Sequence, residues 1–290
     1  MTLDQLRVFV AVAERQHMTR AAEALNLTQS AVSAAIAALE ARHDVRLFHR
    51  VGRGIELTEA GRGLLADARA VLDRAAAAEQ ALADRRRLLR GRLVLVASQT
   101  IASYWPPRFL ARFSAAHPGV TIDLAIANTA GAAEQVLSGA AELGFVEGPV
   151  DDPALARWQV GEDAMQLVQA AAPAPGRVGI DALRAARWVM RERGSGTRAV
   201  LEAMLAGLGI DPAALTVALA LPSNEAVRTA VEAGQGMAAL STLVVAPSLR
   251  LGTLHALDVA LPPRPFYGLR HKERYRSRAA DTLLDLIGMG

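Results

Sequence analysis

The chain of 290 residues contains no cysteine and very little lysine. Without cysteine there can be no disulfide, no thiolate metal site and no thiol redox sensor. Because Lys272 is the only lysine, arginine supplies nearly all of the positive charge. Arginine stays charged near neutral pH, and its planar guanidinium suits phosphate and guanine.

Long apolar runs are also absent. No stretch reaches about 18 uncharged apolar residues, so we expect no membrane span. The opening residues MTLDQLRVFV lack a basic segment followed by an apolar stretch and a cleavage site, which predicts no signal peptide and a cytoplasmic protein. Hydrophobic residues make up 52% of the chain, enough for sizeable cores, and the length suits two or three domains.

The formal net charge is only +3, but the basic residues are clustered. The clusters comprise Arg42, Arg46, Arg50 and Arg53; Arg85, Arg86, Arg87, Arg90 and Arg92; and Arg270, Lys272, Arg274, Arg276 and Arg278. The charged side chains within residues 134–163 are mostly acidic. This distribution suits a chain with one nucleic-acid-binding end, although solvated surface charge is the alternative for any single cluster.

Residues 19–40 have the pattern of a helix-turn-helix, in which two short helices pack across a tight turn. Thr19 is a good N-cap for a short helix over residues 20–25. Asn26 then suits a left-handed C-cap position, and we expect Leu27 to be buried beneath the turn.

The second helix is predicted to run from residue 29 to about residue 40, with Thr28 as its N-cap. Apolar residues recur in it at steps of four and three and predict one buried face, made of Val32, Ile36 and Leu39. Ala21 and Ala22 are small enough to let the two helices pack closely. The alternative is an ordinary helical hairpin inside a core.

The opposite face of the second helix carries the residues that we predict to contact DNA. In a helix-turn-helix the N-terminal part of the second helix enters the major groove. Gln29 can pair with adenine through two hydrogen bonds, and Ser33 can bond a base edge or a phosphate. The predicted contacts from this segment are Thr28, Gln29, Ser30 and Ser33.

Residues 45–57 are predicted to form a short hairpin, because Gly52 and Gly54 permit a turn between two apolar segments. Arg50 and Arg53 lie at its tip. We predict a wing in which Arg53 reaches a minor groove and Arg50 a phosphate. An exposed basic turn is the alternative.

A long helix is predicted over residues 59–89, with Thr58 as its cap. Apolar residues recur in it at alternating steps of four and three, namely Leu64, Ala68, Val71, Ala75, Ala78 and Leu82. This heptad seam predicts a partner helix and therefore dimerisation. The alternative is a helix that packs on its own domain.

The segments AAEALNLTQSAVSAAIAALE and LFHRVGRGIELTEAGRGLL together resemble the winged helix-turn-helix of LysR-type transcriptional regulators. The resemblance is close over residues 1–89. It implies a homodimer or homotetramer that controls transcription through a small effector, with RNA polymerase as a further partner. It also implies DNA contacts at Gln29, Ser30, Ser33 and Arg53. Position 34 departs from the family, because Ala34 stands where arginine is common.

Residues 92–146 alternate strand and helix patterns, which predicts a parallel sheet covered by helices. We expect strands over residues 92–97, 120–127 and 143–146, and helices from after Thr100 to about 116 and around 132–137. A second set follows, with strands over residues 165–171, 188–191 and 236–240, and helices over 180–185, 198–208 and 224–231. Residues 265–290 are expected to return to the first set.

Two such lobes facing each other across a cleft resemble periplasmic binding proteins, and LysR-type effector domains share this arrangement. Ligands of such sheets bind beyond the carboxyl ends of the strands. We therefore predict an effector cleft made of Ser98, Thr100, Asn128, Thr129, Glu147, Arg193, Ser195, Thr197 and Asn224. Local capping is the alternative for any one hydroxyl or amide.

The expected effector is a small anion or organic acid, because glycine-flanked hydroxyls at a helix start, with arginines beside them, form a cradle for an anion. RERGSGTR and the GNT-like and SNEA-like segments resemble a branch of the family that senses metabolites of sulfur, nitrogen or carbon assimilation.

Catalytic motifs are weak throughout. Gly194-Ser195-Gly196 is not a nucleophile elbow, the six histidines are scattered, and no phosphate-binding glycine motif is present. We expect no enzymatic activity, no metal and no cofactor. The competing functions are a solute-binding protein, which the helix-turn-helix disfavours, and an enzyme on the same lobes, for which no acid–base pair can be named.

These patterns predict an α/β protein with a winged helix-turn-helix over residues 1–58, a dimerisation helix over 59–90 and a two-lobed effector domain over 91–290. Lobe I is expected over about 91–163 and 265–290, and lobe II over about 164–264. The expected partners are double-stranded promoter DNA, a small anionic effector and further copies of the chain.

Overall fold

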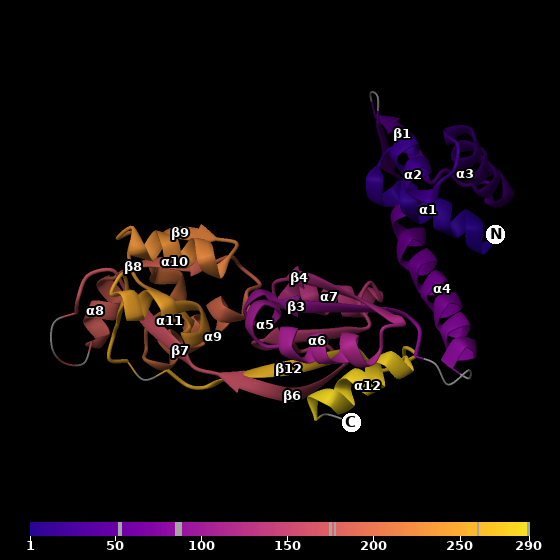
Figure 1. Cartoon of the computed structure of the whole chain (residues 1–290). Helices are drawn as coiled ribbons and strands as arrows, with labels where there is room; N and C mark the ends of the chain where they lie inside the picture. Colours follow the sequence, from indigo (N-terminus) through magenta and orange to yellow (C-terminus); the bar gives the residue numbers. More distant parts are fainter. Residues whose placement is uncertain (52–53, 85–88, 174–175, 177, 260, 289–290) are drawn as a thin grey trace. The chain divides into compact units, whose positions relative to one another are not determined.

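The computed structural model describes residues 1–51, 54–84, 89–173, 176, 178–259 and 261–288. The chain divides into two compact units, Met1–Arg87 and Leu88–Gly290, which are coloured along the sequence in Figure 1. The basic cluster at residues 85–92 lies partly outside the described residues.

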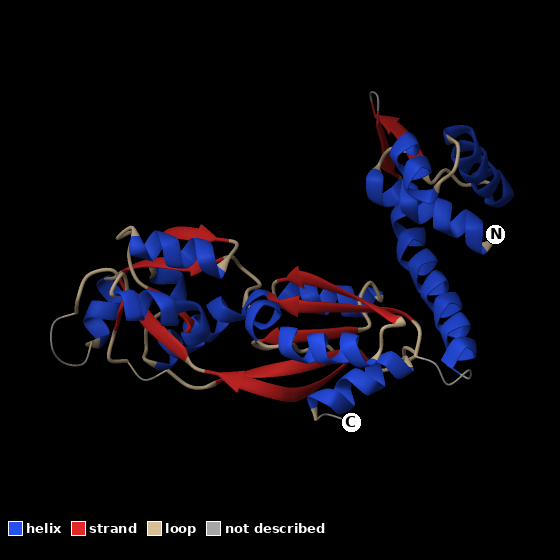
Figure 2. Ribbon diagram, in the orientation of Figure 1, coloured by secondary structure: helices blue, strands red, loops and turns tan. Residues whose placement is uncertain are grey.

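The first unit is a bundle of helices that carries one β-hairpin (Figure 2). Its elements are α1 (Leu3–Arg15), α2 (Met18–Leu25), α3 (Gln29–His43), β1 (Phe48–Val51), β2 (Gly54–Leu57) and α4 (Glu59–Asp84). The apolar faces of the helices form one core, in which Phe9, Val12, Ala21 and Val32 are completely or almost completely buried. Burial of this kind, at roughly 25 cal/mol per Å² of apolar surface, stabilises the short helices.

The helix-turn-helix pattern is present, with two differences at the ends of α2. Helix α2 begins at Met18 rather than after Thr19, because His17 has extended backbone and its ring nitrogen accepts a hydrogen bond from Arg20 N at 3.4 Å. Leu27 is 45% exposed, so the expectation that it is buried was wrong. Its amide closes the turn on Ala22 O at 2.9 Å, and this bond leaves the side chain at the surface.

Helix α4 uses its predicted seam in two ways. Ala68 is buried in the core of its own unit, and Leu64 packs against the same core. Further along, Val71 is 43% exposed and Ala78 is exposed. The first turns of α4 therefore pack against the core of their own unit. The prediction that the seam faces a partner helix along its whole length was wrong for these turns. The helix is described to Asp84, and the side chain of Leu82 lies outside the description.

The second unit contains two lobes (Figure 1). The sheet of lobe I has the strand order β4-β3-β5-β12-β6. Its strands are β3 (Gly91–Ser98), β4 (Val120–Ala127), β5 (Leu143–Glu147), β6 (Leu155–Asp163) and β12 (Arg264–His271), and its helices are α5 (Gln99–Tyr104), α6 (Pro107–Ala116), α7 (Thr129–Ser138) and α12 (Arg278–Ile287). Strands β3, β4 and β5 are parallel as predicted, whereas β12 is antiparallel to both of its neighbours.

Two features of lobe I differ from the sequence expectation. Strand β6 was not predicted, although its residues pair with β12 along the whole length of that strand. The single helix expected between Thr100 and about residue 116 is divided into α5 and α6, because Pro106 and Pro107 follow Trp105 and proline cannot continue a helix from its interior.

Lobe II is built on an antiparallel sheet of order β10-β7-β11 and a parallel pair β8-β9, with a bridge between Trp188 and Met237. Its strands are β7 (Met165–Gln169), β8 (Arg187–Arg191), β9 (Thr216–Leu221), β10 (Ala238–Ser241) and β11 (His255–Ala256), and its helices are α8 (Ile180–Ala185), α9 (Gly196–Gly207), η1 (Pro212–Ala214), α10 (Asn224–Glu232) and α11 (Thr242–Leu251). The chain crosses between the lobes after Asp163 of β6 and again before Arg264 of β12.

Candidate functional site

The N-terminal end of α3 presents polar side chains to solvent. Val32, Ile36 and Leu39 bury the opposite face of the helix. Thr28 caps the helix by accepting a hydrogen bond from Ala31 N at 3.2 Å, as predicted.

The side chains on this face are held by one another. Gln29 Nε2 donates to Ser33 Oγ at 3.1 Å, and the hydroxyls of Thr28 and Ser30 lie 3.0 Å apart. These hydrogen bonds lie on an exposed surface. Replacing them with hydrogen bonds to a base or a phosphate would cost little free energy, because an exposed hydrogen bond contributes little to stability.

The predicted wing is a two-stranded hairpin. Strand β1 pairs with β2 in antiparallel register, with Arg50 opposite Ile55, and the Arg50 side chain is exposed. Arg53, which was predicted to reach a minor groove, lies outside the described residues. The hairpin thus offers Arg50 as a surface cation on the same unit as the polar face of α3.

The predicted effector residues meet where the two lobes face each other, but they do not line one open cleft. Six of them are buried in a hydrogen-bonded network between the lobes: Ser98, Thr100, Thr129, Glu147, Thr197 and Asn224. Their polar groups are used by one another and by arginines that were not predicted. Sequence position located the strand ends correctly but could not show that their side chains are already partnered.

Arg264 is at the centre of one half of this network and is completely buried. It binds Asp163 with two hydrogen bonds, of 2.8 and 2.5 Å, and donates to Thr197 Oγ1 at 2.9 Å. It also lies 3.5 Å from Glu147 Oε1. One guanidinium therefore connects the lobe I sheet, the crossing strand β6 and the start of α9 in lobe II.

Glu147 accepts a hydrogen bond from Ser98 Oγ, while Thr129 Oγ1 donates to Glu147 O at 2.5 Å. Burial raises the pKa of Glu147 above its ordinary value, and the positive charge of Arg264 offsets part of that effect. Gly196 lies so close that a Cβ atom there would be 1.8 Å from Glu147 O. The lobes are therefore in tight contact at this point.

Asn224 is at the centre of the other half of the network. It accepts from Arg191 Nη1 at 2.6 Å and donates to Thr100 Oγ1 at 2.9 Å. Its backbone N–H donates to Gln99 Oε1 at 2.7 Å. Arg191 also forms a two-bond ion pair with Glu192, at 2.8 and 3.0 Å. Asn224 thereby links lobe II to the first turn of α5 in lobe I.

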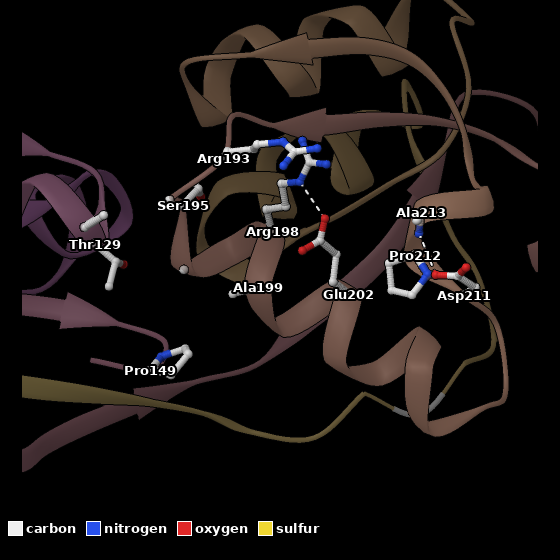
Figure 3. Close-up of a pocket in the computed structure, with 13 residues that line it drawn as sticks. Thr129, Pro149, Arg193, Ser195, Arg198, Ala199, Glu202, Asp211, Pro212 and Ala213 are labelled. Atoms are coloured by element: carbon white, nitrogen blue, oxygen red, sulfur yellow. Dashed lines mark hydrogen bonds and ion pairs between the residues drawn. The ribbon is translucent and has the colours of Figure 1, made fainter. Parts of the chain in front are cut away.

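A pocket of ≈ 580 Å³ adjoins this network at the start of α9 (Figure 3). Three predicted effector residues line it, namely Thr129, Arg193 and Ser195. Asn128 lies beside it, capping α7 through Gly131 N at 2.9 Å and donating to Glu192 at 3.2 Å. Lobe I contributes Thr129, Ala130 and Pro149 to the wall. Lobe II contributes residues 193–195, the first turns of α9 and the turn at residues 211–213.

Two side chains of this pocket have unused hydrogen-bonding capacity. Ser195 is only 3% exposed, and its hydroxyl has no hydrogen-bond partner in the described part of the chain. Arg193 is exposed and forms no ion pair with any described residue. By contrast, Arg198 is held by Glu202 at 2.7 Å. The first N–H groups of α9 lie at the helix end that borders the pocket. They have no acceptor within the helix and are free to bind a ligand.

Sequence reasoning missed the charged residues that organise the junction: Asp163, Arg191, Glu192, Arg198 and Arg264. Arg191 and Arg264 stand at strand ends next to apolar residues. A charged residue in such a position is a sign of a buried ion pair. The partner of Arg264, Asp163, is about a hundred residues away in the sequence and could not be assigned from spacing.

Comparison with known proteins agrees with this architecture. Residues 3–62 match the bacterial regulatory helix-turn-helix protein, lysR family, and residues 86–289 match the LysR substrate binding domain. The uncharacterized HTH-type transcriptional regulator YeiE of Escherichia coli is 36% identical over 291 residues, covering 98% of this chain and 96% of the relative. The HTH-type transcriptional regulator CbbR of Rhodospirillum rubrum is 31% identical over 288 residues, covering 98% and 95%.

Solved structures show the same fold. Full-length CbnR complexed with its target DNA aligns with a TM-score of 0.70 at 23% identity, covering 99% of each chain. The CcmR regulatory domain of Synechocystis in complex with 2-PG aligns with a TM-score of 0.61 at 26% identity, covering 68% of this chain and 96% of that one.

Within the described residues, no helix is both long and apolar enough to cross a membrane. The expectation of a non-enzymatic protein agrees with relatives that are transcriptional regulators. On the two family matches, which together cover nearly the whole sequence, the chain belongs to the LysR family of transcriptional regulators.

Proposed function

We propose that this regulator reads promoter DNA with the polar face of α3 and the wing, and that a small anion bound beside α9 changes its affinity for that DNA. The observation that carries the effector half is Ser195, a residue only 3% exposed that lines the pocket beside Arg193. Neither the Ser195 hydroxyl nor the Arg193 guanidinium has a partner among the described residues. The CcmR regulatory domain has the same fold and binds 2-PG, which supports a small ligand.

An anion is the ligand that this pocket suits best. The start of a helix carries partial positive charge and free N–H groups, and an arginine adds a full charge. The Ser195 hydroxyl can donate one more hydrogen bond to an oxyanion. The acidic residues of the pocket are engaged, since Glu202 pairs with Arg198 and Asp211 accepts from Ala213 N at 2.9 Å.

The DNA-contacting residues that we propose are Thr28, Gln29, Ser30, Ser33, Arg50 and Arg53. Gln29 is placed for base readout because it is exposed in the first turn of α3. Arg50 is exposed on the wing, and we propose that it contacts a phosphate. A specific complex with DNA selected from a random duplex library, weakened by Gln29→Ala and sensitive to salt, is the expected result.

We also propose that the chain works as a homodimer or homotetramer. Val71 and Ala78 lie exposed on α4 at seam positions that the unit's own core does not use. A second α4 would cover them and place two copies of α3 to read two half-sites. Anion binding would then act by shifting the population of lobe arrangements, and through them the placement of the DNA-binding units.

The effector half is tested by thermal unfolding of the full chain with phosphate, sulfate and small mono- and dicarboxylates. An anion that binds the folded state at 100 times its Kd stabilises it by about 2.7 kcal/mol. Ser195→Ala and Arg193→Ala should remove most of that gain. Arg250→Ala is the matched control, because Arg250 is an exposed arginine of lobe II outside the pocket. No stabilising anion, or equal stabilisation in all variants, would contradict the proposed pocket.

A further inference from the structure

Glu40 is the only buried charged residue among the described residues of the DNA-binding unit, at 8% exposure. It lies in the last turn of α3, where the helix dipole disfavours a negative charge. Burying a carboxylate also carries a desolvation cost unless hydrogen bonds compensate for it. The position is therefore unfavourable for the helix itself, and its compensation comes from another element.

That element is the base of the wing. Glu40 Oε1 accepts hydrogen bonds from Leu47 N at 2.8 Å and Phe48 N at 3.2 Å. Glu40 Oε2 pairs with Arg46 at 3.1 Å. Phe48 is the first residue of β1, so the carboxylate holds the backbone at the point where the wing begins.

The same segment is held from its other side by the start of α4. Thr58 Oγ1 donates to Arg46 O at 2.7 Å, and Thr58 N donates to Leu47 O at 3.0 Å. Residues 46–48 thus lie between a carboxylate of α3 and the cap of α4. Because β1 is only four residues long, the direction set at Phe48 determines where Arg50 lies.

We infer that Glu40 is a positioning residue for DNA recognition, which fixes the wing relative to α3 so that both elements engage one duplex together. The inference rests on the proposed wing contact of Arg50. It predicts that Arg50 contributes to binding only while Glu40 accepts the two N–H groups. Glu40 Oε1 accepts the two backbone hydrogen bonds, whereas Oε2 pairs with Arg46. The length of the side chain, which brings Oε1 to the two amides, therefore matters more than its charge.

Two substitutions separate reach from charge. Glu40→Gln keeps an oxygen at the same distance but removes the negative charge. Glu40→Asp keeps the charge but shortens the side chain by one methylene, so it cannot reach both amides. Glu56→Gln is the control, because it removes an exposed carboxylate from β2 that lies near His49 but makes no bond to the backbone of residues 46–48.

The experiment measures binding of the full chain to a duplex selected by the wild type, over a range of salt, with and without Arg50→Ala. In the wild type, Arg50→Ala should weaken binding and lower the slope of log K against log salt by about 0.9 for each DNA-bound copy of the chain, the value for one phosphate contact per copy. The same effect should persist with Glu40→Gln and Glu56→Gln. With Glu40→Asp, Arg50→Ala should change affinity by less than about twofold, within ordinary additivity error, and leave the slope unchanged.

The outcomes are distinct. An equal effect of Arg50→Ala in the wild type and in Glu40→Asp overturns the role of Glu40 and leaves the proposed wing contact standing. No effect of Arg50→Ala in the wild type overturns the wing contact, and with it the inference. Partial unfolding of a variant would weaken binding without changing the salt slope, so the slope separates positioning from a fold defect.

Discussion

Neutralising the two acids beside Arg264 is predicted to change the free energy of unfolding by unequal amounts. Asp163 makes both short bonds to the guanidinium, whereas Glu147 stands 3.5 Å from it. Asp163→Asn removes the main partner of a fully buried cation, and breaking a buried pair in this way costs about 3–5 kcal/mol. Glu147→Gln removes a charge that burial already disfavours and leaves the Asp163 pair intact, so we expect a change within about 1 kcal/mol.

Tryptophan fluorescence is a suitable assay, because Trp105, Trp158 and Trp188 all lie in the unit Leu88–Gly290. For a domain of this size each kcal/mol shifts Tm by about 2–4 °C, so Asp163→Asn should lower the Tm by about 10 °C. Glu147→Gln should leave it nearly unchanged. Equal losses in both variants would refute this assignment of charges around Arg264.

The same pair gives a pH test of definite sign. Because burial raises the pKa of Glu147 above its ordinary 4.5, the folded protein holds a proton that the unfolded chain releases. The stability contributed by this group is therefore full below pH 4.5 and is lost as pH rises through the raised pKa. Glu147→Gln should remove that decline from the curve of unfolding free energy against pH. A curve identical to that of the wild type would contradict the raised pKa.

Two further predictions concern packing and assembly. Gly196→Ala should destabilise the effector unit by about 1–3 kcal/mol, since its Cβ would clash with Glu147 O. Gly207→Ala is the control, because this glycine of the same helix has open space around it and its substitution should not destabilise the unit. Equal unfolding midpoints in the two variants would count against tight contact between the lobes. Val71→Glu with Ala78→Glu should reduce the mass measured by light scattering, because like charges would face each other across the proposed seam. The control is Ala76→Glu, which is exposed on the same helix off the seam, and an unchanged mass in the double variant would refute the seam.

Much of the fold could be predicted from local signals. The start and the buried face of α3 were predicted from the Thr28 cap and from apolar residues at steps of three and four. Both signals depend only on residues within or next to this one helix. Strand β4 was predicted with its observed ends because residues 120–127 are a continuous β-forming run. Strand β6 was missed because its pairing partner, β12, lies about a hundred residues later in the chain.

The candidate site could be predicted only in part, for a related reason. Position at a strand end identified Ser98 and Glu147, and a glycine-flanked hydroxyl at a helix start identified Ser195. Neither signal showed which of these side chains is free to bind a ligand. That depends on the bonds from Arg264 to Thr197 and from Arg191 to Asn224, which join residues distant in the sequence. The N-cap of α2 was placed at Thr19 because threonine is the better capping residue, whereas the backbone at His17 already provides the extended conformation and an acceptor.

The most direct test of the whole account is the DNA affinity of the full chain with and without the anion that most raises its Tm. We predict that the anion changes the Kd for selected DNA, that DNA changes the Kd for the anion by the same factor, and that Ser195→Ala abolishes both effects. Equal DNA affinity with and without a bound anion in the wild type would contradict the proposal that this regulator responds to a small anion.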